Sequence, residues 1–198
     1  MTILPYNAEK SAYRGSDVSK VVVVTDSTAT VPSDLVQALD IRIVPVLLVL
    51  DNQTFRDGVD ITPGDVYRWL RASKQIPTSA APSVGDFVRT FAAAAQEASG
   101  IVSIHMSPDL SATYNVALTA SQLVEGAPIR VVNCHTAAMG QGFAALEAAR
   151  AAARGATLDE VVSRIEEVVA RVNLLFALDT FEYLHRGGRI GGAAALMG

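Results

Sequence analysis

Short apolar runs that alternate with helix-like segments constrain the fold of this chain more than any other feature of its sequence. Five runs predict strands, over residues 20–25, 43–50, 101–106, 129–133 and 174–178. Continuous apolar runs of this length are typical of parallel strands that are covered on both faces. Strands that alternate with helices therefore predict an α/β fold, in which a parallel sheet lies between two helical layers as an α/β/α sandwich.

Three helices are predicted from their first turns, where a hydroxyl residue stands three positions before a carboxylate. The three pairs are Thr62 with Asp65, Ser83 with Asp86, and Thr157 with Glu160. This spacing is that of the capping box, in which each side chain satisfies a backbone N–H group of the other residue. After Ser83, Phe87 and Phe91 recur at the spacing of one helix face, which predicts that this helix packs on the sheet.

Composition narrows the class of protein and of partner. Half of the 198 residues are hydrophobic, which is enough for a sizeable core, and the length suits one full domain plus a fragment. The 16 Lys and Arg residues are spread without long runs among 20 Asp and Glu residues, for a net charge of −4, so we expect no binding of nucleic acid. Because no apolar run is long enough to cross a bilayer, we expect no stable membrane insertion.

The cysteine and histidine content bears on compartment and metal binding. Cys134 is the one cysteine, so it has no partner for an internal disulfide, and the three histidines show no metal-ligand spacing. We therefore expect a cytoplasmic protein without a metal.

Three parts of the chain differ in character. Residues 1–19 lack a regular apolar pattern and are expected to form an N-terminal tail, and residues 20–173 hold the predicted α/β domain. Residues 174–198 run from an apolar segment into a glycine-rich sequence that closes on small and apolar side chains. We expect this last part to begin a second, α+β domain whose remainder is absent.

Hydroxyl side chains are concentrated where the predicted strands end. Ligands of open α/β sheets gather at the carboxyl ends of parallel strands, so Asp26, Ser27, Ser111 and Thr113 are candidate ligand contacts. Thr78 and Ser79 form a further hydroxyl cluster in the connection ahead of the Ser83 helix and are candidates as well. The alternative for each is a helix cap or turn, the common role of Ser and Thr at such positions. Ser83 fits that alternative, whereas Ser79 and Ser111 have no obvious local role in the sequence.

Two residues invite a catalytic interpretation that the sequence does not favour. His105 lies inside an apolar strand-like run, where a buried, hydrogen-bonded histidine is more common than a catalytic base. Cys134 and His135 are adjacent, and adjacent side chains on a strand point to opposite faces, so they do not readily form a thiol–imidazole pair. We find no nucleophile elbow, no Walker loop and no dinucleotide-binding glycine motif.

Several motifs, taken in order, resemble those of the DegV family. They are Thr25-Asp26-Ser27, Phe55-Arg56-Asp57-Gly58-Val59-Asp60-Ile61, Ser103-Ile104-His105-Met106-Ser107, Leu110-Ser111-Ala112-Thr113-Tyr114 and Arg186-Gly187-Gly188-Arg189-Ile190-Gly191. The resemblance extends from Lys20 to the end of the chain. Five motifs in the family's order are far more specific than any one of them.

The chain departs from the family's pattern at three places. Ser79 stands where the family's T-S-Q-P-S segment has threonine, and Ala80 and Ala81 replace its serine and glutamine. Ala112 replaces a glycine, which limits the backbone there to ordinary dihedral angles. The family's aspartate-serine pair after the fourth strand is Asn133-Cys134. Thr78 is the candidate to substitute for the lost amide.

The resemblance implies a function and a set of site residues. A DegV protein binds a long-chain fatty acid by its carboxylate, here through Ser79 and Ser111, and presents it to a fatty acid kinase that forms the acyl phosphate. The chain itself would then be a carrier, with no catalytic residue and no cofactor other than the bound lipid. Arg189, next to paired glycines, is a candidate for anion contact or kinase docking, with a hinge as its alternative.

A competing hypothesis makes the chain an enzyme on the same scaffold. A phosphotransferase or hydrolase for a small phosphorylated or acylated substrate would use Asp26 or His105 as its base and Arg189 to hold the anion. The fold cannot separate the two hypotheses, because such scaffolds carry both kinds of function.

Overall fold

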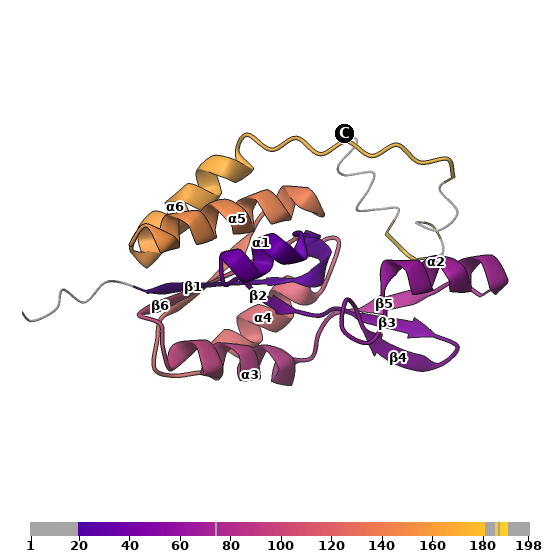
Figure 1. Cartoon of the computed structure of the whole chain (residues 1–198), viewed down its shortest axis with the longest axis horizontal. Coiled ribbons are helices and arrows are strands. Elements are labelled where there is room, and N and C mark those ends of the chain that lie inside the picture. The colour runs from indigo at the N-terminus through magenta and orange to yellow at the C-terminus, as the bar shows by residue number, and fades with distance from the viewer. Residues whose placement is uncertain (1–19, 74, 181–184, 186, 190–198) are drawn as a thin grey trace, which may run out of the picture.

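A computed structural model describes residues 20–73, 75–180, 185 and 187–189. Its centre is a parallel sheet of four strands (Figure 1). The strands stand in the spatial order β2 (Arg42–Val44), β1 (Val21–Asp26), β6 (Gly100–His105) and β7 (Ile129–Asn133). All six residues of β1 and of β6 are buried, as expected for central strands that are covered on both faces.

Helices cover both faces of this sheet, which confirms the predicted α/β/α sandwich. One layer contains α1 (Ser33–Ala38), α5 (Met139–Ala153) and α6 (Leu158–Val169), and the other contains α3 (Val84–Ala95) and α4 (Thr113–Ser121) (Figure 1). Each layer has its own apolar cluster against the sheet. Phe87 and Phe91 of α3 are fully buried, so the predicted apolar face of this helix is confirmed.

The three predicted capping boxes are confirmed. Ser83 caps α3, Thr157 caps α6, and Thr62 caps α2 (Pro63–Ala72), each with the hydroxyl and the carboxylate reciprocally bonded to backbone N–H groups. These motifs are local in sequence, so they need no tertiary contact to form.

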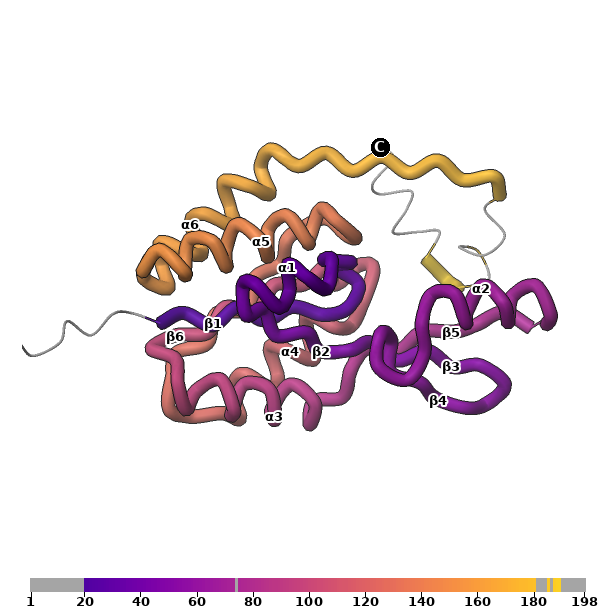
Figure 2. Tube along the Cα trace, viewed as in Figure 1, coloured from indigo at the N-terminus to yellow at the C-terminus, as the bar shows by residue number. Residues whose placement is uncertain are grey.

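A second, smaller sheet lies beside the first. It is antiparallel, with β3 (Leu47–Leu50) between β4 (Gln53–Arg56) and β5 (Thr78–Ala80). Figure 2 shows the chain leave the four-stranded sheet after β2, pass through this small sheet and α2, and return at α3. The small sheet therefore forms an insertion between two elements of the sandwich.

The prediction of one strand over residues 43–50 is wrong. Two strands occupy this region: β2 pairs with β1 in the parallel sheet, and β3 pairs with β4 and β5 in the small sheet. Pro45 lies between them and has no N–H group to donate to a ladder. The apolar pattern continues across the proline, but the pairing does not.

The prediction of a strand over residues 174–178 is also wrong. This segment has no regular structure, and Leu175 and Phe176 are 93% and 59% exposed. A strand exists only when a neighbour completes its hydrogen bonds, and no strand of the described residues pairs with this segment. The predicted tail and most of the predicted second domain lie outside the described residues. In the part of the chain that the structure describes, no helix combines the length and the apolar character that crossing a bilayer requires.

Candidate functional site

A buried polar network joins the carboxyl ends of β1 and β6. Asp26 is fully buried, and its Oδ2 accepts from His105 Nδ1 at 2.6 Å and from Gln141 Nε2 at 3.0 Å. Its Oδ1 accepts from the Thr28 backbone N–H at 3.0 Å and from the Thr28 hydroxyl. Both carboxylate oxygens are thus occupied by donors of the protein itself.

These donors determine the charge of Asp26. Burial alone would raise the pKa of this carboxyl group, but the hydrogen bond and charge of His105 and the bonds from Thr28 and Gln141 outweigh burial, so the pKa lies below its ordinary value of 3.8. Asp26 is therefore ionised at neutral pH. An ionised carboxylate only accepts hydrogen bonds, so the imidazole proton of this pair belongs on Nδ1 of His105.

Ser103, His105 and Asp26 are connected in the order of a serine–histidine–aspartate triad. The Ser103 hydroxyl lies 2.7 Å from Nε2 of His105, and Nδ1 contacts Asp26, as in that triad. All three side chains have no exposed surface, and the Phe87 ring packs edge-on against the imidazole. A substrate cannot reach this serine or this base in the structure. The interpretation of His105 as a buried, hydrogen-bonded residue is confirmed.

Gln141 also belongs to this network, although we did not predict a role for it from the sequence. From the first turn of α5 its Nε2 also donates to Thr25 Oγ1 at 2.9 Å and to the Ile104 carbonyl at 3.2 Å. The helix can approach so closely because a Cβ atom at Gly142 would lie only 2.6 Å from the Ala29 carbonyl oxygen. The glycines on either side of Gln141 are the sequence signal for this contact.

Ser27 follows Asp26 and links β1 to the small sheet. Its Oγ accepts a hydrogen bond from the Val46 N–H group at 3.1 Å, and Val46 lies directly before β3. Ser27 therefore has an internal partner in addition to any ligand contact. Its predicted role in binding stays a prediction.

Ser111 and Thr113 lie between β6 and α4. Ser111 Oγ accepts from the Thr113 N–H group at 3.3 Å, and the two hydroxyl oxygens are 2.9 Å apart. The expectation that Ser111 has no local role is wrong, because it forms this turn at the start of α4. Thr113 is almost fully buried, whereas Ser111 is half-buried. Ala112 has φ −68° and ψ −7°, the ordinary dihedral angles that the sequence predicts.

Thr78 and Ser79 lie on β5 at the edge of the small sheet, and both are exposed. Successive side chains of a strand point to opposite faces, so the two hydroxyls lie on opposite faces of this sheet. Ser79 stands opposite Leu48, which stands opposite Phe55 on the other side. Within the described residues no hydrogen bond to the Ser79 hydroxyl is formed, and its face continues across the sheet as Leu48 and Phe55.

Arg189 is exposed and donates from Nη1 to the Gly187 carbonyl at 2.6 Å. Gly188 between them has φ +71°, a conformation that favours glycine. Arg186 lies outside the described residues. The structure thus places Arg189 directly after a turn, and its proposed anion contact stays a prediction.

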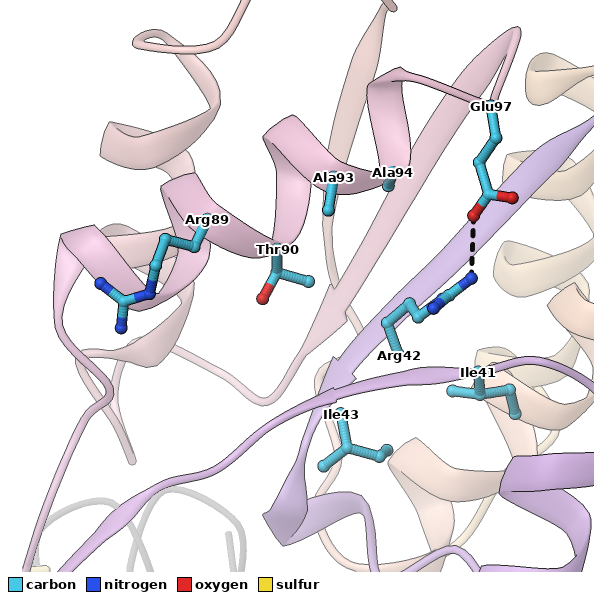
Figure 3. Close-up of a pocket in the computed structure, with 8 residues that line it drawn as sticks. All are labelled: Ile41, Arg42, Ile43, Arg89, Thr90, Ala93, Ala94 and Glu97. Carbon is cyan, nitrogen blue, oxygen red and sulfur yellow. Dashed lines mark hydrogen bonds and ion pairs between the residues drawn. The ribbon is translucent and has the colours of Figure 1, made fainter.

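A pocket of about 460 Å³ lies elsewhere, between the edge strand β2 and α3 (Figure 3). Its walls are Ile41, Arg42, Ile43, Arg89, Thr90, Ala93, Ala94 and Glu97. Arg42 and Glu97 form an ion pair at 2.8 Å on one side, which Figure 3 shows as a dashed line. None of the predicted ligand contacts lines this pocket.

Neither thiol nor metal chemistry is built into the described residues. Cys134 is fully buried, and burial raises the pKa of its thiol to about 11, so it carries almost no thiolate at neutral pH. His135 is exposed beside it, which confirms that the two do not form a pair. Within residues 20–73 and 75–180, no group of three or more metal-binding side chains comes together.

The fold and these side chains define an α/β domain in which hydroxyl groups, and not an accessible triad or metal cluster, mark the strand ends of the described part. The profile of the family described as "Uncharacterised protein, DegV family" matches residues 20–198. The chain belongs to the DegV family.

Known relatives are longer than this chain. A DegV domain-containing protein of Listeria monocytogenes is 32% identical over 180 residues, which are 90% of this chain and 64% of that protein. This chain thus spans slightly less than two thirds of the length of that relative.

Two solved structures of the family resemble the fold closely. A DegV family protein of Thermus thermophilus, described by its fatty acid binding, is 35% identical with a TM-score of 0.82 over 90% of this chain and 63% of its own. A stearic acid-binding protein of Eubacterium ventriosum is 26% identical with a TM-score of 0.80, over 91% and 64% of the two chains.

Proposed function

We propose that this chain binds a long-chain fatty acid, whose carboxylate accepts hydrogen bonds from the hydroxyl groups of Ser79 and Ser111. The observation that carries the proposal is the row formed by Ser79, Leu48 and Phe55 across the small sheet. An exposed hydroxyl that has no hydrogen-bond partner among the described residues stands at one end of an apolar row, which suits a ligand with a polar head and an apolar tail. Fatty acid binding by the Thermus thermophilus and Eubacterium ventriosum proteins supports this ligand class.

The contacts of Ser111 are compatible with a donor role. Its oxygen already accepts from the backbone N–H group of Thr113, and the Thr113 hydroxyl can donate to it as well. In that arrangement the Ser111 hydrogen is directed to another acceptor, and a carboxylate is the strongest one that a lipid offers. In this arrangement the buried Thr113 orients the Ser111 hydroxyl, and Ser111 contacts the ligand.

The tail dominates the affinity of such a ligand. About 14 methylenes at about 0.8 kcal/mol each contribute roughly 11 kcal/mol when they are buried, whereas each hydrogen bond to a charged acceptor contributes about 1.5–3 kcal/mol. Association costs of about 4–15 kcal/mol offset much of this sum. The two serines therefore determine where the carboxylate lies more than how tightly the lipid binds.

We further propose that the protein is a cytoplasmic carrier that presents the carboxylate to a partner kinase, and that it catalyses no step itself. The inaccessible Ser103–His105 pair supports a carrier over a hydrolase. In this proposal Arg189 contacts the transferred phosphoryl group or the kinase. The competing enzyme hypothesis has no observation in its favour among the described residues.

Binding is tested by titration with cis-parinaric acid, a fluorescent fatty acid, after organic extraction of the purified chain and mass spectrometry of the extract. We expect a fatty acid in the extract, and we expect Ser79→Ala to weaken cis-parinaric acid binding about tenfold, the loss of one bond to a charged acceptor. Thr54→Ala is the matched control, because Thr54 is exposed on the same sheet but stands opposite Val49, on the face that Ser79 does not share. Equal affinity of Ser79→Ala and Thr54→Ala would contradict the role of Ser79.

Presentation is tested separately with the partner kinase. We expect Arg189→Ala to slow acyl phosphate formation while its affinity for cis-parinaric acid stays unchanged. A wild-type rate would remove Arg189 from the proposal, and acyl phosphate or ester hydrolysis by the chain without a kinase would favour the enzyme hypothesis.

A further inference from the structure

Two separate arms of the chain carry the serines of the proposed site. The Ser79 arm begins at Ser27, passes through the Ser27–Val46 hydrogen bond into β3, and reaches Ser79 through its pairing with Leu48. The Ser111 arm is the segment from His105 at the end of β6 to Ser111. Within it the Ser107 carbonyl accepts from the N–H groups of Leu110 and Ser111 at 3.0 and 3.1 Å.

The buried network connects the two arms at the points where they begin. Asp26, the residue before Ser27, accepts from His105, the first residue of the other arm, at 2.6 Å. Both side chains have no exposed surface, so water does not compete for this bond. A short hydrogen bond to an ionised acceptor in a dry site is among the strongest and most directional that a protein forms.

We propose that the Asp26–His105 bond and the Ser27–Val46 bond form a strut that fixes the distance between the Ser79 arm and the Ser111 arm. Asp26, His105 and Ser27 are then positioning residues, and they act on the ligand through the two serines. This assigns a use to a buried triad-like arrangement that no substrate can reach. The strut concerns the distance between the two arms, and its effect on fatty acid binding rests on the proposed function.

The strut has a defined weak point. Asp26 and His105 are also held by the strands that carry them, because β1 and β6 pair along their length. Ser27 is half-buried, and its bond to Val46 crosses from the four-stranded sheet to the small sheet. Loss of the Ser27 hydroxyl should therefore loosen the Ser79 arm without unfolding the sandwich.

The distance between the arms is measured by electron paramagnetic resonance on spin labels at Ala80→Cys and Asp109→Cys. Both positions are exposed, both leave Ser79 and Ser111 intact, and the buried Cys134 with its raised pKa should stay unlabelled. We expect one narrow distance in the otherwise unchanged chain, a broad distribution in Ser27→Ala, and about tenfold weaker cis-parinaric acid binding in Ser27→Ala without the labels.

Thr90→Val is the matched control. It also removes one part-buried hydroxyl bond to a backbone group, that of Thr90 to the Asp86 carbonyl within α3, but it lies on neither arm. The Asp26–His105 bond is tested with two further variants. His105→Phe should broaden the distance distribution. His105→Asn should restore a narrow one, because the amide N–H group of the asparagine can replace Nδ1 as the donor to Asp26.

The two proposals fail in different ways. Equal distance distributions in Ser27→Ala, Thr90→Val and the parent would overturn the strut, whatever the lipid does. If the distribution broadens in Ser27→Ala but the parent chain binds no cis-parinaric acid, the strut stands and the proposed function of this chain fails. If His105→Phe does not fold, Ser27→Ala against Thr90→Val still decides the result.

Discussion

The four-stranded sheet and the small sheet are stabilised in different ways. The first lies between two dense apolar clusters, in which Phe87, Phe91 and Ile165 have no exposed surface. The second, with α2, has few buried apolar side chains, namely Val46, Leu50 and Ile61 at 5–7% exposed. None of the residues of α2 is buried.

The smaller region has exposed polar contacts between its elements. The Trp69 indole donates to Asp51 at 2.9 Å, and Arg56 forms a two-pronged pair with Asp60. Bonds of this kind in exposed positions stabilise little. Ser79 therefore lies on the less stable of the two regions, where small energies suffice to change its position, as is common for binding segments.

The largest expected difference comes from removing one phenyl ring in each region. Phe87→Ala should lower the free energy of unfolding by about 3–5 kcal/mol, because it opens a cavity in a closed cluster. Phe55→Ala on β4, which is only partly buried, should cost less than about 1.5 kcal/mol, since less apolar surface returns to water. Urea unfolding measures both values. Equal losses would show that the small sheet is as densely packed as the sandwich.

The next effect concerns the network between the regions. Asp26→Asn should lower the free energy of unfolding by about 2–3 kcal/mol at neutral pH, because the donors around Oδ1 and Oδ2 lose a charged acceptor. Since the folded pKa of Asp26 lies below its ordinary 3.8, this contribution is complete above that pH and is lost as the pH falls through the folded value. The gap between the two proteins should therefore shrink in acid. Urea unfolding from pH 7 to pH 2 checks the trend, and a constant gap would mean that Asp26 does not titrate with a lowered pKa.

The smallest expected effects come from removing one helix cap in each region. Ser83→Ala and Thr62→Ala each remove the hydroxyl of a capping box, which costs about 1 kcal/mol. For α3 this loss should lower the free energy of global unfolding, because α3 belongs to the sandwich. For α2 it should mainly accelerate amide hydrogen exchange within residues 63–72. A lower free energy of global unfolding with unchanged exchange in α2 after Thr62→Ala would contradict this division.

Local sequence patterns predicted many of the helices and strands. The capping boxes start the helices α2, α3 and α6 because both partners of each box lie within four residues. The run over residues 129–133 matches β7. The structure was harder to predict where strand pairing decides the outcome. The run over residues 43–50 divides between two sheets at Pro45, and residues 174–178 have no pairing strand among the described residues.

The candidate site was predictable in its residue types but not in its arrangement. A hydroxyl after a strand indicated Ser111, and a hydroxyl cluster ahead of the Ser83 helix indicated Ser79. The register of β5 against β3 is what places Leu48 beside Ser79. Gln141 was missed because it meets Asp26 across 115 positions of sequence. The periodic patterns used to predict helices and strands give no indication of a contact between residues so far apart in the chain.

The sequence by itself therefore determined the alternation of strands and helices, the helix starts and the family, because these depend on neighbours along the chain. Only the tertiary structure decided that the chain divides between two sheets at Pro45, that His105 faces Asp26 in a dry interior, and that Ser27 ties one sheet to the other. The physical reason is that hydrogen bonding and burial act between side chains that are close in space, and those of Asp26 and His105 are 79 residues apart in the chain.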